Sequence, residues 1–243
     1  MYRGFLNFIF PEPLHCKLCQ QPMRSHGVAG ICGRCIERLP LINTSACRVC
    51  GKPLYIQSTC SECDNEVLYF YERAIAVGLY EGAIRHYIHR LKYYKDISLA
   101  EPLGSLMAIR LKEGKDFYQS EVVIPVPISP KKKEKRGFNQ SYLLARVISR
   151  ILKKPLLSDC LKRVKDTRAQ SSLSRQDRLK NLRGAFQVTI PGQLRGKEVL
   201  LVDDVYTTGS TVNECARVLM GSGALKVNVI VLATVALDSN LKR

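Results

Sequence analysis

Eight cysteines within the first 63 residues form four pairs of the type Cys-x-x-Cys, and this spacing restricts the fold more than any other feature of the 243-residue chain. The two residues inside each pair let the backbone turn so that both sulfurs face one metal ion, and two pairs complete a tetrahedral shell of four thiolates. The pattern predicts two structural zinc ions bound by Cys16, Cys19, Cys32, Cys35, Cys47, Cys50, Cys60 and Cys63.

Two alternatives to this interpretation concern the pairing and the chemistry of the cysteines. Consecutive pairs would give one site before residue 36 and another after residue 46, whereas interleaved pairs would mix the two groups. A disulfide scaffold would need an oxidising compartment. The opening stretch MYRGFLNFIFPEP lacks the small-residue cleavage site of a secretory signal, so we interpret it as a short helix docked on the protein. Zinc is therefore the preferred interpretation, and a closed four-thiolate site stabilises a fold rather than catalysing a reaction.

The pattern of the chain changes near residue 67, where strand-like and helix-like segments begin to alternate. We therefore predict two domains, a short helix with a double zinc ribbon at 1–66 and a second domain at 67–243. In the second domain, Ile84, Ile88 and Leu91 lie on one stripe of an expected helix. Apolar strands that alternate with helices are typical of a parallel sheet with helices on both faces, the α/β class. The expected strands are 71–80, 121–127, 198–204 and 227–237, and the expected helices are 81–94, 98–112, 140–152 and 209–221.

The formal net charge of +17 is concentrated in one part of the second domain, since residues 131–183 carry 17 Lys or Arg against 4 Asp or Glu. A solvated basic surface is one explanation. This density favours binding to phosphate-rich partners, because each cation placed near a phosphate displaces condensed counterions. No apolar run approaches the roughly 20 residues that cross a bilayer. We therefore expect a cytoplasmic protein without membrane insertion.

The stretch VLLVDDVYTTGST at 199–211 combines a buried strand, two aspartates and a hydroxyl-rich turn before a helix. Free N–H groups at a helix N-terminus and a turn rich in hydroxyls form a cradle for an anion. Asp203 and Asp204, at the expected end of the strand, would accept hydrogen bonds from nearby ligand hydroxyls or hold a magnesium ion that arrives with the ligand. A phosphate beside a pair of hydroxyls indicates a sugar phosphate. The alternative is an ordinary capped helix after a turn.

This stretch resembles the phosphoribosyl pyrophosphate (PRPP) loop of type I phosphoribosyltransferases. The resemblance implies that Asp203 and Asp204 bind the ribose 2′- and 3′-hydroxyls, with Mg²⁺ accompanying the PRPP. It also implies that the turn wraps the 5′-phosphate with Thr207, Thr208, Gly209, Ser210 and Thr211. Ser210 departs from the pattern, because many members of the superfamily have a second glycine there.

Three further segments narrow the resemblance: IPVPISPKKKEKRGFNQS, DTRAQSSLSRQDRLKNLRGAF and the four cysteine pairs. Together with the PRPP-like loop they resemble the ComF family of competence proteins over nearly the whole chain. Members of this family are associated with natural transformation, in which they work with the helicase ComFA as single-stranded DNA enters the cytoplasm. The resemblance therefore implies single-stranded DNA, PRPP and a ComFA-type helicase as partners.

The same resemblance assigns roles to residues between the strand at 121–127 and the loop at 166–178. A basic loop would follow the strand and form the pyrophosphate loop, with Pro127, Arg136, Gly137, Phe138, Asn139 and Gln140. A mobile loop would close over PRPP, with Thr167, Gln170, Arg175 and Arg178. The DNA contacts follow from the basic run itself rather than from the resemblance: the phosphates would contact Lys131, Lys132, Lys133, Lys135 and Arg136, with Phe138 as a stacking platform.

Three functional hypotheses follow from these patterns. The first is a competence factor that binds PRPP and single-stranded DNA. The second is an active phosphoribosyltransferase that transfers ribose 5-phosphate to a base or an amine, for which the sequence offers no recognisable acceptor pocket and no assigned catalytic residue. The third is an interaction module whose zinc ribbons dock the helicase, and it is compatible with the first.

Overall fold

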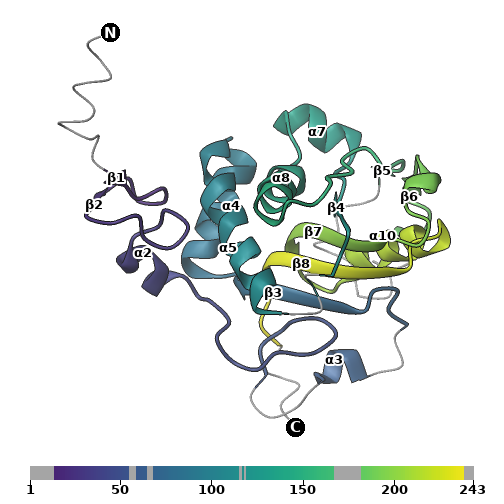
Figure 1. Cartoon of the computed structure of the whole chain (residues 1–243), viewed down its shortest axis with the longest axis horizontal. Helices are drawn as coiled ribbons and strands as arrows, with labels where there is room; N and C mark the ends of the chain where they lie inside the picture. The colour runs from purple at the N-terminus through teal and green to yellow at the C-terminus, as the bar shows by residue number, and fades with distance from the viewer. Residues whose placement is uncertain are drawn as a thin grey trace.

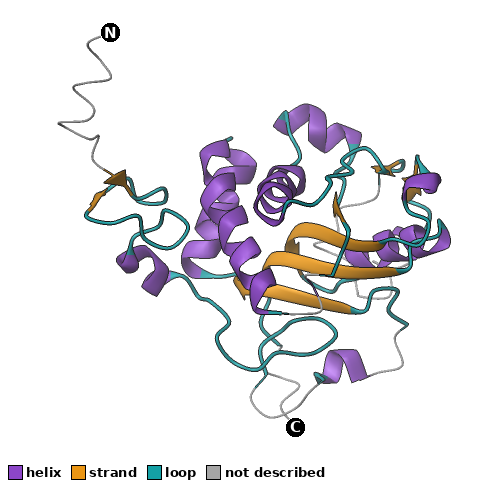
Figure 2. Ribbon diagram, viewed as in Figure 1, coloured by secondary structure: helices purple, strands orange, loops and turns teal. Residues whose placement is uncertain are grey.

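The protein is described here from a computed structural model that covers residues 14–54, 59–64, 68–114, 117, 119–166 and 182–237. Four parallel strands form its central sheet in the order β3-β8-β7-β4 (Figures 1 and 2). Their bounds are Arg73–Leu79 for β3, Val122–Pro125 for β4, Glu198–Tyr206 for β7 and Lys226–Thr234 for β8. The helix expected in the opening stretch lies outside the described residues.

Helices cover both faces of this sheet, as the alternation of strands and helices predicts. Side chains of β7 alternate between the faces, since Leu200 and Val202 join one hydrophobic cluster while Val199 and Leu201 join the other. The first face is covered by α4 (Gly82–Tyr93), α5 (Ala100–Glu113) and α8 (Gln140–Leu152), and the second by α10 (Ser210–Gly221). A 3₁₀ turn at Ile97–Leu99 precedes α5. The predicted α/β class is confirmed.

Helix α4 shows how the apolar pattern determines the packing. Ile84, Ile88 and Leu91 are fully buried, and the first two lie in the cluster that α4 shares with α5, α8 and the sheet. Burying an aliphatic side chain of this size contributes about 1.5–3 kcal/mol. The predicted stripe is confirmed, and it fixes which residues of α4 face away from the core.

The two cysteine-rich modules join the hydrophobic clusters on opposite sides of the sheet. The first contains β1 (Leu14–His15), β2 (Pro22–Met23) and α2 (Gly33–Arg38), and its Cys16 and Cys35 belong to the cluster of α4 and α5. The second contains α3 (Ser61–Asp64), and its Cys47, Cys50 and Cys60 belong to the cluster of α10. The division at residues 66 and 67 stays a prediction, because the ribbons share both clusters with the sheet.

The chain between the two modules covers the outer edge of strand β3. The Ile42 N–H donates to the Val77 carbonyl at 3.0 Å, and the Leu79 N–H donates to the Pro40 carbonyl at 2.8 Å. An uncovered edge strand would present unpaired backbone groups to other chains. The chain between the two modules is therefore attached to the sheet through backbone hydrogen bonds.

Three elements differ from the sequence prediction. Strand β7 does not end at the aspartates but continues to Tyr206, because Val205 and Tyr206 pair with Ala233 and Thr234 of β8. The basic run expected as a loop forms helix α7 (Pro130–Arg136). An antiparallel hairpin of β5 (Leu161–Arg163) and β6 (Phe186–Val188) was not predicted, and a 3₁₀ turn at Pro191–Gln193 follows it.

Candidate ligand cleft and metal sites

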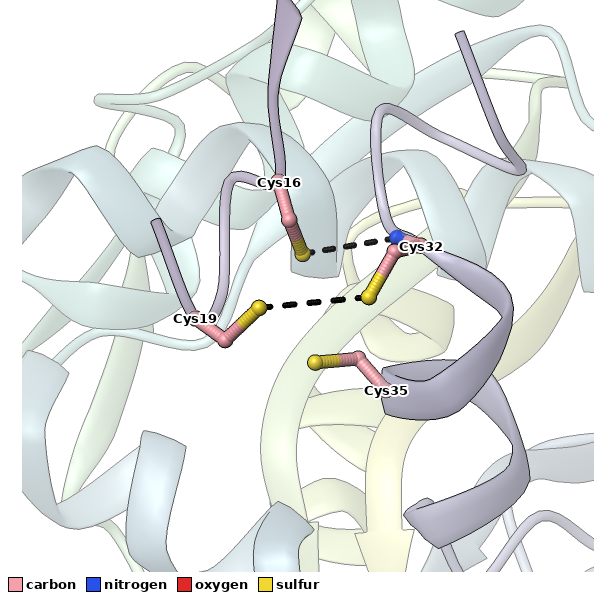
Figure 3. Close-up of side chains that lie close together, drawn as sticks. All are labelled: Cys16, Cys19, Cys32 and Cys35. Carbon is pink, nitrogen blue, oxygen red and sulfur yellow. Dashed lines mark hydrogen bonds between the residues drawn. The ribbon is translucent and has the colours of Figure 1, made fainter. Parts of the chain in front are cut away.

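The eight paired cysteines form two separate groups, each with four ligand sulfurs within 4.8 Å of one another. Consecutive pairs combine, so one group holds Cys16, Cys19, Cys32 and Cys35 (Figure 3) and the other holds Cys47, Cys50, Cys60 and Cys63. The alternative of interleaved pairs is therefore wrong.

The spacing of the sulfurs fits a tetrahedral zinc ion. Tetrahedral zinc–thiolate bonds of about 2.3 Å place two sulfurs about 3.8 Å apart. The Cys19 and Cys32 sulfurs are 3.9 Å apart, and the Cys50 and Cys60 sulfurs are 3.6 Å apart. In each group a backbone N–H donates to the first sulfur at 3.4 Å, from Cys32 to Cys16 in one and from Cys60 to Cys47 in the other. Such hydrogen bonds stabilise thiolate ligands.

A cleft of about 540 Å³ opens where the strands β4 and β7 end. Ligands of parallel sheets gather at this end of the strands. The acidic floor of the cleft is formed by Asp203 and Asp204 of β7, which are only 8% and 4% exposed. Its walls come from the end of α4, from the start of α7, from α8 and from the β5 end of the hairpin.

Hydrogen bonds hold both aspartate carboxylates in place. One oxygen of Asp203 accepts from the Ser141 hydroxyl at 2.7 Å and from the Asp204 backbone N–H at 2.9 Å. Asp204 accepts from the Gln140 side-chain amide at 3.0 Å and forms an ion pair with the Lys92 ammonium of α4. Because Ser141 and Gln140 open helix α8, the start of that helix positions both carboxylates.

The two carboxyl groups have different pKa values because their surroundings differ. Burial, with the neighbouring Asp204 charge, raises the pKa of Asp203 to about 7. Burial also acts to raise the pKa of Asp204, but the Lys92 ammonium and the Gln140 hydrogen bond outweigh it and hold that pKa below its ordinary value. The pair therefore carries one firmly ionised carboxylate, which Lys92 neutralises, beside one that titrates near neutrality.

The loop between β7 and α10 has the geometry of an anion cradle. Gly209 caps α10 in the left-handed conformation, with φ +76°. A Cβ at this position would lie 2.1 Å from the Tyr206 hydroxyl, so only glycine fits between that ring and the helix. The Thr208 and Ser210 hydroxyls are 3.0 Å apart, and Thr207 and Thr211 line the cleft.

Cations and one aromatic ring form the opposite wall of the cleft. The Arg136 guanidinium lies 5.5 Å from the centre of the Tyr93 ring and donates to the Gln140 side-chain oxygen at 2.5 Å. Burial and the neighbouring charges of Arg163 and Arg136 lower the pKa of Lys132. Five cations line a cleft with an acidic floor: Lys92, Lys131, Lys132, Arg136 and Arg163. The cleft suits an anion that also carries hydroxyl groups.

Many of the residues singled out from sequence meet in this cleft. Those that line it are Pro127, Lys131, Lys132, Arg136, Gln140, Asp203, Asp204, Thr207 and Thr211. Gly209 and Ser210 line a small hollow beside it. Lys133, Gly137, Phe138 and Asn139 face a second cleft on the other side of α7, and Lys135 lines neither. The predicted mobile-loop residues Thr167, Gln170, Arg175 and Arg178 lie outside the described residues.

Sequence reasoning missed Lys92, Tyr93 and Arg163 of this cleft, whereas Asp166 is the first residue of the predicted mobile loop at 166–178. Lys92 follows the last apolar residue of the buried α4 stripe, where a lysine is expected to reach solvent. Arg163 ends strand β5, which was not predicted. Lys92 is recognisable as a residue of the cleft only from the tertiary structure, in which the end of α4 lies beside β7.

Two protein-family models match separate parts of the chain. The double zinc ribbon domain family matches residues 5–64, and the phosphoribosyl transferase domain family matches residues 139–241. These ranges contain both cysteine groups, the start of α8 and the loop before α10.

Competence protein F of Haemophilus influenzae is 31% identical to this chain over 219 residues, which is 83% of this chain and 96% of that protein. The chain belongs to the ComF family. Other relatives of this ComF-family protein include DNA utilization protein YhgH of Escherichia coli K12, which is 32% identical and covers 88% of this chain and 94% of its own. Competence protein ComFC of Bacillus subtilis is 27% identical and covers 79% of each chain. Within the described residues, this ComF-family protein has no helix of the length and apolarity that a bilayer crossing requires.

Proposed function

We propose that this ComF-family protein binds PRPP in the cleft at the end of β7 and acts as a cytoplasmic competence factor in DNA uptake. One observation carries the proposal. Two buried carboxylates, the hydroxyl-rich loop before α10 and a wall of cations line the same cleft. A sugar that carries phosphate at one end and pyrophosphate at the other needs all three.

Each part of PRPP has a matching group in the proposed complex. The 5′-phosphate accepts from the backbone N–H groups at the start of α10 and from the hydroxyls of Thr207 and Thr211. The ribose hydroxyls donate to Asp203 and Asp204. The pyrophosphate lies against Lys92, Lys132 and Arg136, since charge-assisted hydrogen bonds to phosphate are stronger than neutral ones.

The magnesium ion of this proposal arrives with PRPP. The carboxylates of Asp203 and Asp204 are already hydrogen bonded by Ser141 and Gln140. They suit an ion that keeps several waters and ligand oxygens, which is the usual coordination of Mg²⁺ in phosphate sites. The ion would neutralise part of the pyrophosphate charge.

Calorimetric titration with Mg²⁺-PRPP tests this proposal. We expect binding by the wild type, binding weakened at least tenfold in Asp204→Asn, and unchanged zinc content in both. The double variant Asp203→Asn with Asp204→Asn tests the pair together. Failure of the wild type to bind PRPP at any accessible concentration would refute the proposal.

Single-stranded DNA is the proposed macromolecular ligand, and α7 is its proposed phosphate-binding surface. The cations of α7 are Lys131, Lys132, Lys133 and Lys135, with Arg136 at the end of the helix. Binding of this kind falls steeply with salt, because each neutralised phosphate releases counterions. Three of these cations, Lys131, Lys132 and Arg136, also line the PRPP cleft. We therefore expect PRPP to compete partially with DNA, and a salt-independent DNA affinity would exclude this surface.

The relatives' names support the biological setting of this proposal, since two are competence proteins and one is a DNA utilization protein. We propose that the protein works with a ComFA-type helicase, with the zinc ribbons as the docking surface. Loss of helicase binding in Cys47→Ser with Cys50→Ser, in a variant that keeps its folded sheet, would support this docking surface. Retained binding would exclude it.

An active phosphoribosyltransferase is the second candidate function. It is favoured by the hairpin that places Arg163 and Asp166 in the cleft beside the proposed pyrophosphate site. Release of pyrophosphate that depends on one base or amine acceptor would establish it. Absence of release across a broad acceptor panel, in a protein that binds PRPP, would leave binding alone as the function.

A further inference from the structure

A second cleft, of about 510 Å³, lies on the side of α7 that faces away from the acidic floor. It is bounded by α7, by the first turn of α8 and by the chain that leads into β5. A volume of this size is in the range of clefts that bind a nucleotide-sized ligand. Nothing in the PRPP proposal uses it.

Two aromatic side chains line this second cleft, whereas the first cleft is lined mainly by cations and by the two aspartates. Phe138 and Tyr142 line it and remain half-buried, so part of each ring faces the open space. Phe138 precedes the cap of α8, a position from which a side chain commonly packs on Leu143. This position accounts for Phe138 alone, whereas Tyr142 lies inside the first turn of α8 and lines the same open cleft.

Polar and cationic groups complete the lining of this second cleft. Lys133, Lys162 and Arg163 supply positive charge, and Ser158 and Asp159 supply a hydroxyl and a carboxylate. The Asp159 carboxylate is an acceptor for an amino or imino N–H group. Flat rings, cations and one acceptor together suit a nucleobase whose phosphates lie close by.

The two clefts share a wall. Pro127, Ile128 and Arg163 line both of them, and α7 lies between the two. Lys131 and Lys132 face the first cleft, whereas Lys133 faces the second. A DNA single strand whose phosphates lie along α7 would therefore pass the mouth of the second cleft.

We propose that the second cleft binds one nucleobase of a DNA single strand whose phosphates lie along α7. The base stacks on Tyr142 and Phe138, and Asp159 accepts a hydrogen bond from its edge. This inference rests on the proposed binding of single-stranded DNA. It adds a base-binding site that is separate from the PRPP cleft.

The test compares a short DNA strand with a strand of the same length whose central nucleotides are abasic. The abasic strand keeps the phosphates and removes the rings. By fluorescence anisotropy at fixed salt, we expect the wild type to bind the abasic strand about tenfold more weakly, in line with the loss of base stacking. Tyr142→Ala should bind both strands with equal affinity.

A second variant and two controls distinguish a loss of base binding from misfolding of the variant. Ser158→Leu fills the cleft without an added ring and leaves Phe138 and Tyr142 in place, and it should also lose the preference for bases. Tyr94→Ala, in an exposed tyrosine outside this cleft, should keep the preference. PRPP affinity should match the wild type in all three variants, which shows that the first cleft is intact.

Three results would overturn the proposal. Equal binding of both strands by the wild type would show that only phosphates are recognised. A preserved preference in both Tyr142→Ala and Ser158→Leu would place the base elsewhere. Failure of the wild type to bind either strand would refute DNA binding as well, while the PRPP titration would still stand by itself.

Discussion

Lys92, in the last turn of α4, affects how the paired aspartates can bind a ligand. The Lys92 ammonium and the Asp204 carboxylate form an ion pair whose side chains are 16% and 6% exposed. A buried carboxylate needs such a partner, because an unpaired charge in the interior is strongly destabilising. Any ribose hydroxyl that donates to Asp204 must share this carboxylate with Lys92. The same ammonium lies at the wall proposed for the pyrophosphate.

Lys92→Met separates these two roles. We expect the affinity for PRPP and for pyrophosphate to fall about 10- to 100-fold, the range of a lost charged hydrogen bond. The affinity for ribose 5-phosphate should fall much less, because Asp204 loses a competitor for its oxygens. Titration calorimetry with the three ligands measures the difference.

The matched control is Lys112→Met, an exposed lysine of α5. It should change none of the three affinities. An equal loss for all three ligands in Lys92→Met would mean that the lysine only maintains the shape of the cleft.

The raised pKa of Asp203, about 7, predicts an unusual dependence of stability on pH. The folded protein holds this proton more tightly than the unfolded chain, in which the pKa is about 3.9. The contribution to stability is therefore fully present below pH about 4 and is lost as the pH rises to about 7. The depressed pKa of Asp204 acts in the opposite direction and only below that window, since its contribution is lost as the pH falls.

Asp203→Asn removes this titration and keeps an oxygen that accepts from Ser141. Between pH 5 and pH 8 we expect the free energy of unfolding of the wild type to fall relative to that of the variant, by a few kcal/mol at most. Urea unfolding at several pH values measures both. Parallel profiles for the two proteins would show that Asp203 titrates far from neutrality.

At the scale of elements, the junction of β7 with α10 depends on one glycine. Gly209→Ala places a methyl group against the Tyr206 ring and forces an alanine into the left-handed conformation. We expect a loss of about 1–3 kcal/mol in unfolding free energy and a weaker affinity for ribose 5-phosphate. Thermal unfolding and calorimetry check the two effects.

Gly221→Ala is the control in the same helix. Gly221 ends α10 with open space around its Cβ position, so the alanine should leave ligand affinity unchanged and stability equal or slightly higher. If both variants bind ribose 5-phosphate like the wild type, the cradle tolerates a displaced Tyr206 and our account of Gly209 is wrong.

Sequence patterns predicted the elements that bury a full apolar face. Strands β7 and β8 carry short apolar runs rich in valine, isoleucine and leucine, and α4 and α8 carry apolar stripes, so their type and order follow from these patterns. Helix α7 has no buried residue, and periodicity gave no signal for it. Its signals are local: Ser129 caps it by accepting from the Lys132 N–H, Pro130 opens it, and Gly137 ends it at φ +86°.

The parts of the candidate site that lie in one continuous segment were predictable from sequence. The parts formed by contacts between distant segments were not. The run from Asp203 to Thr211 is continuous in sequence and forms the floor and cradle of the cleft. The ion pair of Lys92 with Asp204 joins residues of α4 and β7, and no local pattern marks such a contact. The hairpin that brings Arg163 to the cleft has strands of three residues each, too short for an alternating pattern to stand out.

At the scale of the whole molecule, the second cysteine group connects to the anion cradle through three tyrosines. The Tyr69 hydroxyl donates to the Cys63 sulfur at 3.4 Å, and the rings of Tyr69 and Tyr71 lie 5.4 Å apart. The Tyr71 and Tyr206 hydroxyls are 2.9 Å apart, and the Tyr206 hydroxyl lies beside Gly209. The first group, with Cys16, belongs to the cluster on the opposite face.

This arrangement predicts that the two zinc sites are not equivalent for ligand binding. Cys16→Ser and Cys47→Ser should each remove one of the two ions, as measured by zinc analysis. Only Cys47→Ser should weaken ribose 5-phosphate binding, by about 2- to 30-fold, the range found for residues that couple distant sites. Loss of the second ion removes the contact that holds Tyr69 and Tyr71. These two tyrosines in turn hold the Tyr206 ring, which lies beside Gly209 in the anion cradle.

Tyr71→Phe distinguishes coupling through the tyrosines from general destabilisation. It removes the hydroxyl that contacts Tyr206 and leaves both cysteine groups intact, so we expect two bound zinc ions together with part of the affinity loss of Cys47→Ser. Wild-type affinity in Tyr71→Phe would exclude this route. The two cysteine groups belong to hydrophobic clusters on opposite sides of the sheet, and the second group contacts the tyrosines. Equal losses of affinity in Cys16→Ser and Cys47→Ser would therefore mean that the ribbons support the cleft only through the stability of the whole sheet.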